Sequence, residues 1–440
     1  MAADARLAAP VHTAKRDLLG EIGFVFFLLL IFIGLKPFAI RDQAALAFGQ
    51  GTGEGDSWRQ ITFLAAFLLI AAAAWRANGA RMAAAIPPVL TALLFWCLAT
   101  CLWAQAPDVT LRRAGLEVVI VLSAMLGVQT IGMDRAFQLL RAVLAAVLVI
   151  NWVSIPLITQ AIHLPGEGDP GIVGDWRGLY FHKNIAGSVS AITAILFFFE
   201  ALKSKRLVHW AIALAALGFL VMTRSKTSLA LLPVAVLMGS LYPLLRRKSL
   251  DRWIVASIFA LLLCVAAVAV TVYYQPIVRF LTDPAELTGR TAIWAGEIAF
   301  IRDHLLLGAG FGTFADTGAL SPLHNYVAAT WIQNEAHGHN AYLQLLVTIG
   351  GVGFVLAMIA FIVQPAMAFA RITEARKYAP LFAIFVFMIF HNFVESDYLE
   401  GDGPAWVVFV LMLASLRLSA APESKRAPVV PGPALQWLAP

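Results

Sequence analysis

The sequence predicts an all-α polytopic membrane protein with about twelve transmembrane helices. Hydrophobic residues make up 60% of the 440 residues, charged residues only 13%, and the mean hydropathy is +0.80. A soluble globular domain carries about a quarter charged residues, so most of this chain must contact something other than water. The apolar residues also gather in runs of about 20, the length of helix that crosses a bilayer. The formal charge of +6 is therefore attributed to membrane electrostatics, and no nucleic-acid partner is expected.

Twelve apolar runs, each bounded by charges or turn residues, give this count. In chain order they cover residues 19–40, 58–75, 86–104, 114–132, 136–160, 180–202, 207–223, 225–245, 252–275, 339–370, 379–395 and 403–419. The first run follows Lys15 and Arg16, but it is longer than a signal-peptide core and lacks a clear small-residue cleavage site. We therefore expect it to remain as a span.

The distribution of Lys and Arg predicts the orientation. An even number of spans puts both termini on one side of the membrane. If that side is the cytoplasm, it holds 20 of the 32 basic residues and leaves 12 outside, as the positive-inside rule requires. The clusters 203–206 and 246–248 lie in short loops, where the rule is strongest. We expect cytoplasmic termini in a bacterial inner-membrane protein.

Four regions follow from these spans. Residues 1–275 carry helices one to nine, 276–338 form a large periplasmic loop, 339–419 carry helices ten to twelve, and 420–440 form a proline-rich, disordered cytoplasmic tail. Loops as long as 276–338 are usually functional. A second outer segment, 161–179, is rich in glycine. We expect the chemistry on this outer side.

Two basic residues, Arg224 and Lys226, lie in Thr223-Arg-Ser-Lys-Thr-Ser228, between the seventh and eighth predicted spans. One interpretation is a basic turn that snorkels to lipid headgroups. However, Lys and Arg are disfavoured on the outer face, so two in one tight turn indicate an anionic ligand. Phosphate is the natural candidate.

A second basic group precedes the sixth span, in the segment 177–187. Its candidate binding residues are Arg177, His182, Lys183 and Asn184. Capping of the helix start would explain Asn184 but not its three basic or titratable neighbours. Arg290 lies in the large loop, in Thr288-Gly-Arg-Thr-Ala-Ile-Trp294, where a plain surface arginine is the alternative. The nearby Gly308-Ala-Gly-Phe-Gly312 is better explained by turns than by a phosphate-cradling loop.

The histidines are the candidates for acid–base chemistry, because imidazole titrates near neutrality. His337-Gly-His-Asn340 lies where the large loop returns to the membrane. We expect His339 in the first turn of the tenth helix, where the helix dipole favours neutral imidazole. A metal site of His337, His339 and His324 is the alternative, but no metal-binding motif accompanies them. The three cysteines lack paired spacing. We predict neither a metal nor a cofactor.

Together these motifs resemble the O-antigen ligase family of membrane glycosyltransferases. The resemblance rests on His339-Asn340 followed after nine residues by Gly350-Gly-Val-Gly353, and on Arg290 to Trp294 followed by 308–312. Phe181-His-Lys-Asn184 and Thr223-Arg-Ser225 are similar to further motifs of the superfamily. The similarity covers most of 170–360 and extends to the twelve-helix layout with its large loop between helices nine and ten.

The resemblance implies a GT-C-like fold and a polysaccharide donor linked to undecaprenyl pyrophosphate. The acceptor would be a sugar hydroxyl of lipid A-core, joined by metal-independent, inverting displacement at the periplasmic face. The family's essential residues correspond to Arg224, Arg290 and His339. Lys226, Arg177 and Asn340 become candidate binding residues beside the group at 182–184, as does His337, which the motif itself does not select.

Two alternatives stay open at the level of the sequence. An O-antigen polymerase or a protein O-glycosylating ligase of the same superfamily would carry the same motifs. A lipid-linked oligosaccharide transporter would also need many spans, but it should show charged residues near mid-membrane. Glu117 is the main such residue here. Sugar identity, chain-length preference, the lateral entry site for the lipid and oligomeric state are not predicted.

Overall fold

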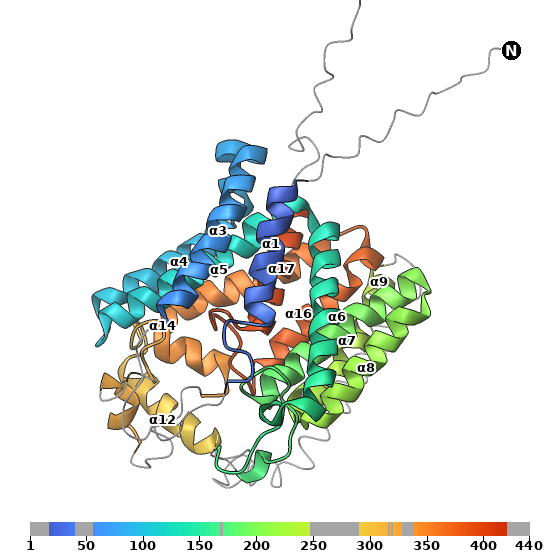
Figure 1. The fold of residues 1–440 in the computed structure, drawn as a ribbon. Helices are drawn as coiled ribbons and strands as arrows, with labels where there is room; N and C mark the ends of the chain where they lie inside the picture. Colours follow the sequence, from blue (N-terminus) through green and yellow to red (C-terminus); the bar gives the residue numbers. More distant parts are fainter. Residues whose placement is uncertain are drawn as a thin grey trace, which may run out of the picture.

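The computed structural model describes residues 17–39, 56–167, 170–246, 290–315, 317, 320–327 and 338–419. These residues form a helical bundle (Figure 1), and their one β contact is an isolated bridge between Ile162 and Trp176. The α-helices are α1 (Leu18–Phe32), α3 (Ser57–Asn78), α4 (Pro88–Ala99), α5 (Pro107–Ile131), α6 (Met133–Leu157), α7 (Lys183–Ser204), α8 (Leu207–Thr223), α9 (Lys226–Leu245), α12 (Arg290–Asp303), α14 (Ala341–Met358), α15 (Gln364–Arg371), α16 (Ala375–His391) and α17 (Pro404–Ser419).

The helices confirm an all-α, multi-pass membrane protein. Every predicted span overlaps a described helix except 252–275, which lies outside the described residues together with the tail 420–440. Six helical segments are long and apolar enough to cross a membrane: Ser57–Ala85, Pro107–Ile131, Met133–Leu157, Lys183–Ser204, Lys226–Leu245 and Ala341–Arg371. Shorter apolar helices accompany them, α1, α8 and α17 among them. The count of twelve and the GT-C-like arrangement stay predictions.

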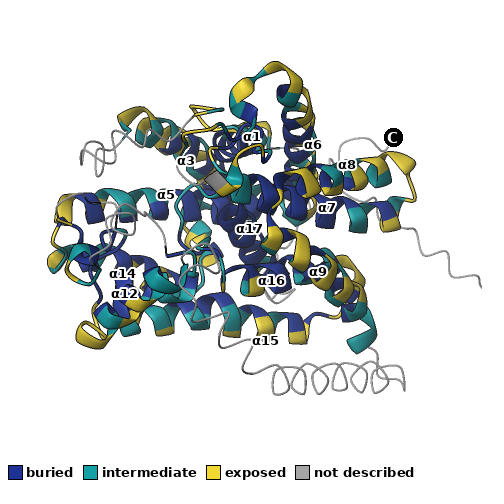
Figure 2. Cartoon of the chain, turned by 90° about the horizontal axis from the view of Figure 1, so that it is seen from below, coloured by how far each residue is buried: buried dark blue, intermediate teal, exposed yellow. Residues whose placement is uncertain are grey.

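Helix α17 lies at the centre of the bundle. Its residues from Pro404 to Leu416 are all buried, and it packs against α5, α7, α15 and α16. In Figure 2 its ribbon is dark blue, whereas the peripheral helices carry exposed positions. Large apolar side chains on those helices point outward, including Leu68 of α3, Leu214 of α8 and Leu237 of α9. Because water would not stabilise such a surface, it is the surface expected to face lipid.

Glu117 has a structural explanation. Its Oε1 accepts a hydrogen bond from Trp406 Nε1 at 2.7 Å and its Oε2 accepts one from the Gly401 amide at 2.8 Å. The side chain is fully buried, so α5 is tied to the start of α17 and to the loop before it. The carboxyl group expected of a transporter therefore has a structural role here: it holds the loop 392–403 in place.

The glycine motifs bring the segment 305–310 against α14. Gly350 interrupts this helix with φ +65° and ψ −176°, which frees backbone groups that a regular helix would pair. The Gly351 amide donates to Leu305 O at 2.7 Å and the Gly310 amide to Thr348 O at 2.9 Å. A side chain at Gly350 would collide with the Leu306 carbonyl. The loop glycines thus make turns and close backbone contacts, as expected from the sequence.

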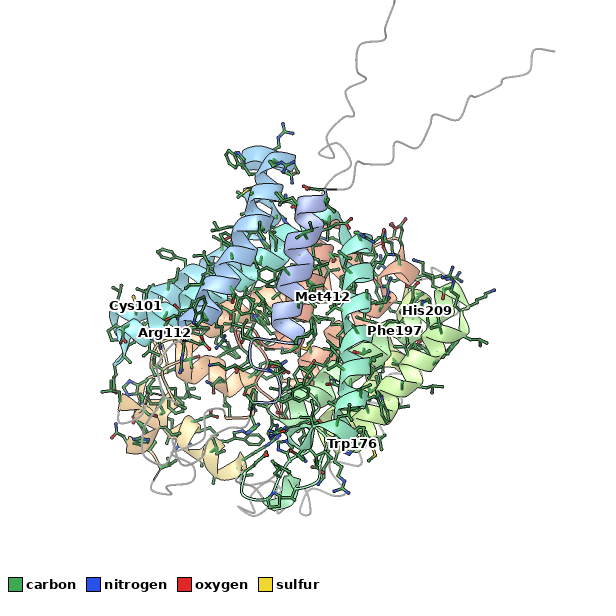
Figure 3. The ribbon with its side chains drawn as sticks, viewed as in Figure 1. Cys101, Arg112, Trp176, Phe197, His209 and Met412 are labelled. Atoms are coloured by element: carbon green, nitrogen blue, oxygen red, sulfur yellow. The ribbon has the colours of Figure 1, made fainter. Side chains whose placement is uncertain are left out.

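The bundle has two distinct ends. Figure 3 labels Trp176, in the loop before α7, at the lower end, and His209, near the start of α8, at the right and above Trp176. Helix α12 lies at the lower end, close to α14 (Figure 1). The loop 372–374 that joins α15 to α16 belongs to the opposite end, because Ile372 O accepts a hydrogen bond from Arg246 Nη2 at 3.0 Å. Arg246 follows the last residue of α9, whereas α9 begins at Lys226, close to the loop before α7.

Candidate functional site

A buried carboxylate, Glu395, gathers three of the candidate residues. It lies in the loop between α16 and α17 and is 7% exposed. Its Oε1 accepts hydrogen bonds from Arg290 Nη2 at 3.0 Å and from Asn184 Nδ2 at 2.9 Å, and its Oε2 lies 3.4 Å from His339 Nδ1. The partners come from α7, from α12 and from the residues before α14, so distant parts of the chain meet at this point.

Electrostatics keep Glu395 ionised. Burial alone would raise the pKa of this carboxyl, but the hydrogen bond with His339 and the positive charge of Arg290 outweigh burial and lower the pKa to about 2. The carboxylate therefore carries its charge at neutral pH. A fixed negative charge beside Nδ1 favours the tautomer with the proton on that nitrogen, which leaves Nε2 of His339 as the acceptor.

His339 precedes its helix rather than occupying the first turn. Helix α14 begins at Ala341, and Asn340 is the N-cap, whose Oδ1 accepts hydrogen bonds from the Tyr342 and Leu343 amides at 3.0 and 3.1 Å. The expected position of His339 was therefore wrong by two residues. The side chain of Asn340 serves the helix end. His339 has φ +52°, a left-handed conformation that is uncommon for a residue other than glycine.

Helix α12 fixes the other side of His339. Trp294 Nε1 donates a hydrogen bond to the Gly338 carbonyl at 2.7 Å. The Glu297 carboxyl occupies the space that a side chain at residue 338 would need. Burial raises the pKa of Glu297 to about 8, and its Oε2 has no hydrogen-bond partner in the described part of the chain. Because Arg290 begins the same helix, α12 positions the arginine and the backbone of the histidine together.

A second carboxylate, Asp175, joins Lys183 and Arg224. Asp175 is 1% exposed; its Oδ2 pairs with Lys183 Nζ at 2.6 Å and its Oδ1 with Arg224 Nη1 at 3.2 Å. Lys183 binds Asp175 and the next residue, Asn184, binds Glu395. The start of α7 therefore connects the two carboxylates. The Arg224 side chain remains 73% exposed. It is anchored at one nitrogen and can still bind an anion.

Lys226 is also available to a ligand. It begins α9, its side chain is exposed, and it forms no ion pair with the residues that the structure describes. Arg224 caps the preceding helix with φ +50°. The turn thus presents two cations, as the sequence predicts for an anion site.

Arg177 differs from its expected role. Its side chain is fully buried: Nε donates to Gln160 O at 2.7 Å, Nη1 to Phe181 O at 3.0 Å and Nη2 to Glu167 Oε1 at 3.2 Å. With every nitrogen engaged, Arg177 braces the loop before α7 rather than offering a free cation. The sequence shows its charge but not its burial.

His182 caps α7. Its Nδ1 accepts a hydrogen bond from the Asn184 amide at 3.2 Å. Burial is the main reason why the pKa of His182 falls to about 3, with the neighbouring His163 as a further cause. The ring is therefore neutral at physiological pH. His337 lies outside the described residues, so its place relative to His339 stays a prediction. Among the described residues, no group of three or more His, Cys, Asp or Glu side chains could hold a metal ion.

The comparison with protein families agrees with the motifs. Residues 210–358 match the family model described as O-antigen ligase. This segment of the chain is similar to the O-antigen ligase family. No curated protein matches the chain. The matched segment runs from α8 through α14 and includes Arg224, Arg290 and His339. Glu395 and Asp175 lie outside that segment.

The acidic residues of the site were not predicted from the sequence. Glu395 follows an apolar run in His391-Asn-Phe-Val-Glu-Ser-Asp397, a polar group between two spans. A polar group between two spans, on the predicted outer side, is the feature of the sequence that could have pointed to Glu395. Asp175 and Glu297 carried no comparable signal, because an acid in a polar loop is ordinary until its burial is known.

Proposed function

We propose that this protein is an O-antigen ligase that transfers polysaccharide from undecaprenyl pyrophosphate to a sugar hydroxyl of lipid A-core. The observation that carries the proposal is the pairing of His339 with the ionised Glu395, with Arg290 on the same carboxylate. In this account the active site lies at the periplasmic face of the bacterial inner membrane, and both chain termini lie in the cytoplasm.

The acceptor hydroxyl loses its proton to His339. Nε2 takes the proton as the acceptor oxygen forms a bond to the anomeric carbon of the donor sugar. Glu395 keeps the proton of Nδ1 in place and stabilises the imidazolium that results, in the way a carboxylate supports a histidine base in other enzymes. General-base catalysis of this kind contributes roughly 10²- to 10⁴-fold in rate.

The bond that breaks joins the anomeric carbon to the phosphate oxygen. The electron pair leaves with undecaprenyl pyrophosphate, whose charge needs stabilisation. Arg224 and Lys226 are exposed and serve this purpose in our account. A single displacement inverts the anomeric centre. Because these side chains supply the positive charge, the reaction needs no metal ion.

Arg290 has a different task from the one that its motif suggests. Its Nη1 donates a hydrogen bond to the Val394 carbonyl and its Nη2 pairs with Glu395, so two of its three nitrogens are engaged. The remaining Nε is buried and has no hydrogen-bond partner among the residues that the structure describes. We propose that Arg290 holds Glu395 against His339 and offers Nε to an oxygen of the bound donor.

The acceptor distinguishes this proposal from the related activities. The purified protein in nanodiscs is mixed with lipid-linked polysaccharide and, in separate reactions, with lipid A-core, a peptide or a second donor chain. Transfer to lipid A-core, unchanged in the presence of a chelator, supports the proposal. Transfer only to the second donor chain indicates a polymerase, and transfer only to the peptide indicates a protein-glycosylating ligase. Movement of the lipid across the membrane without transfer would indicate a transporter.

A further inference from the structure

A cavity of about 800 Å³ lies at the end of the bundle opposite the candidate site. It is bordered by the start of α4, the end of α15, the start of α16 and the end of α17. The helical segment Ala341–Arg371 is kinked at Gly350 and has 31 residues. His339 precedes its first residue, whereas the residues of this segment that line the cavity begin at Ala360. None of the candidate catalytic residues lines it.

One wall of the cavity is apolar. Leu90, Met367, Leu413 and Leu416 contribute side chains, together with the rings of Pro87 and Pro88. A π-helical turn at Ile359–Val363 separates α14 from α15, and its Ala360 also lines the cavity. π-Helical turns are often found at functional sites. This wall suits a hydrocarbon chain.

The rim of the cavity is basic. Arg371 and Arg417 are exposed and form no ion pair with an acid among the residues that the structure describes. Lys377 pairs with Asp134 at 2.9 Å, and Glu374 is also close enough to act on it electrostatically. The charge of Lys377 is thus balanced by these two acids, and the two arginines provide the uncompensated positive charge.

The basic rim continues beside the cavity. A neighbouring depression of about 520 Å³ shares Thr373, Glu374 and Lys377 with it and adds Arg246 and Arg376. Basic residues at this end are expected from the positive-inside rule, and alone they would indicate only general attraction to anionic lipid. Arg417 Nε donates a hydrogen bond to Ala84 O at 3.4 Å, which leaves its charge uncompensated. A cavity that combines two such arginines with an apolar wall is a more specific feature, because an apolar wall contributes nothing to the binding of free phosphate.

We propose that this cavity binds one anionic glycerophospholipid. The phosphate contacts Arg371 and Arg417, and an acyl chain lies along Leu413 and Met367. Arginine suits a phosphate through paired, charge-assisted hydrogen bonds. The proposal does not depend on the transfer reaction.

The test compares two pairs of cations at the same end of the bundle. The variant Arg371→Gln/Arg417→Gln removes both cavity arginines. The matched control Lys203→Gln/Lys205→Gln removes two exposed cations at the end of α7 that do not line the cavity. Both proteins are purified in neutral detergent. Binding of phosphatidylglycerol, phosphatidylcholine and inorganic phosphate is then measured by native mass spectrometry.

The expected result is one retained phosphatidylglycerol on the wild type and on the control, with binding weaker by about tenfold or more in the arginine variant. Met367→Trp fills the cavity at an exposed position without changing charge, and it should weaken phosphatidylglycerol binding as well. Equal losses in both charge variants, equal retention of phosphatidylcholine, or full binding by Met367→Trp would overturn the proposal. Inorganic phosphate bound as well as the lipid would show a headgroup site without an acyl site, which also contradicts it.

Discussion

The Oε2 atom of Glu395 lies 3.4 Å from Nδ1 of His339, although the two residues are 56 positions apart. Each belongs to a loop that enters a helix, and each is held by further contacts: Arg290 and Asn184 on the carboxylate, and Gly338 against α12 on the histidine side. A histidine oriented by an ionised carboxylate is an effective proton acceptor. The distance is longer than an ideal hydrogen bond, as is common before substrate binds.

Replacing Glu395 with glutamine should remove the charge while keeping the shape. We expect the kcat of transfer to fall by at least about tenfold, because the imidazolium formed during the reaction loses its stabilising partner. The KM for the donor should change by less than about threefold. Steady-state kinetics measure both parameters. Glu395→Asp should recover part of kcat. A Glu395→Gln enzyme with normal kcat would show that the carboxylate is only structural.

A methyl group at Gly338 should displace the histidine. Gly338→Ala would collide with the Glu297 carboxyl, so we expect transfer to fall by more than about tenfold. The double variant Gly338→Ala/Glu297→Ala restores the space and should recover much of that loss, beyond the product of the two single effects. Relative rates under one set of conditions provide the measurement. Strictly additive losses would mean that the two residues do not compete for this space.

The protonated Glu297 makes stability depend on pH. Its pKa rises from an ordinary 4.5 to about 8 in the folded protein. Between these values the unfolded chain releases the proton and the folded chain keeps it. The contribution of Glu297 to the free energy of unfolding is therefore fully present below pH 4.5 and is lost as the pH rises through 8. Thermal melts in detergent from pH 5 to 9 should show the wild type losing several degrees more than Glu297→Gln. The control Glu374→Gln, which changes an exposed acid, should show the same pH dependence of the melting temperature as the wild type. If Glu297→Gln also showed the wild-type pH dependence, the Glu297 carboxyl would already be ionised and the prediction would be wrong.

Replacing Arg224 should affect donor binding, whereas replacing Arg177 should affect the stability of the fold. Arg224→Ala removes an exposed cation, so donor binding should weaken by about tenfold or more while the melting temperature changes little. Arg177→Ala leaves three acceptors of a buried guanidinium without their donor, and the melting temperature should fall by several degrees. Donor titration and thermal melts separate the two effects. If Arg177→Ala bound the donor poorly but kept its melting temperature, Arg177 would be a ligand-binding residue after all.

The sequence predicts the helices because a lipid-facing span needs a long apolar run, and such runs are visible without any structure. The roles assigned to Arg224, Arg290 and His339 came from sequence motifs. Their partners could not be predicted, because they are distant in the sequence. Glu395 and Asp175 act through burial and through residues brought from other helices. The kink at Gly350 likewise depends on the segment 305–310 that packs on it. For Arg177 the prediction was wrong in the opposite way. Its charge in the sequence indicated a ligand-binding residue, whereas its burial shows that it stabilises the loop before α7.

The central claim is that His339 is the base, and the direct measurement is the transfer rate of His339→Ala beside His337→Ala. We expect the first variant to lose two or more orders of magnitude and the second to stay within about tenfold of the wild type. Donor binding should survive in His339→Ala, since the proposal assigns the pyrophosphate to the cations of the 223–228 turn. Thermal melts should show that the variant is folded. A His339→Ala enzyme that transfers polysaccharide at a near-normal rate would contradict the account.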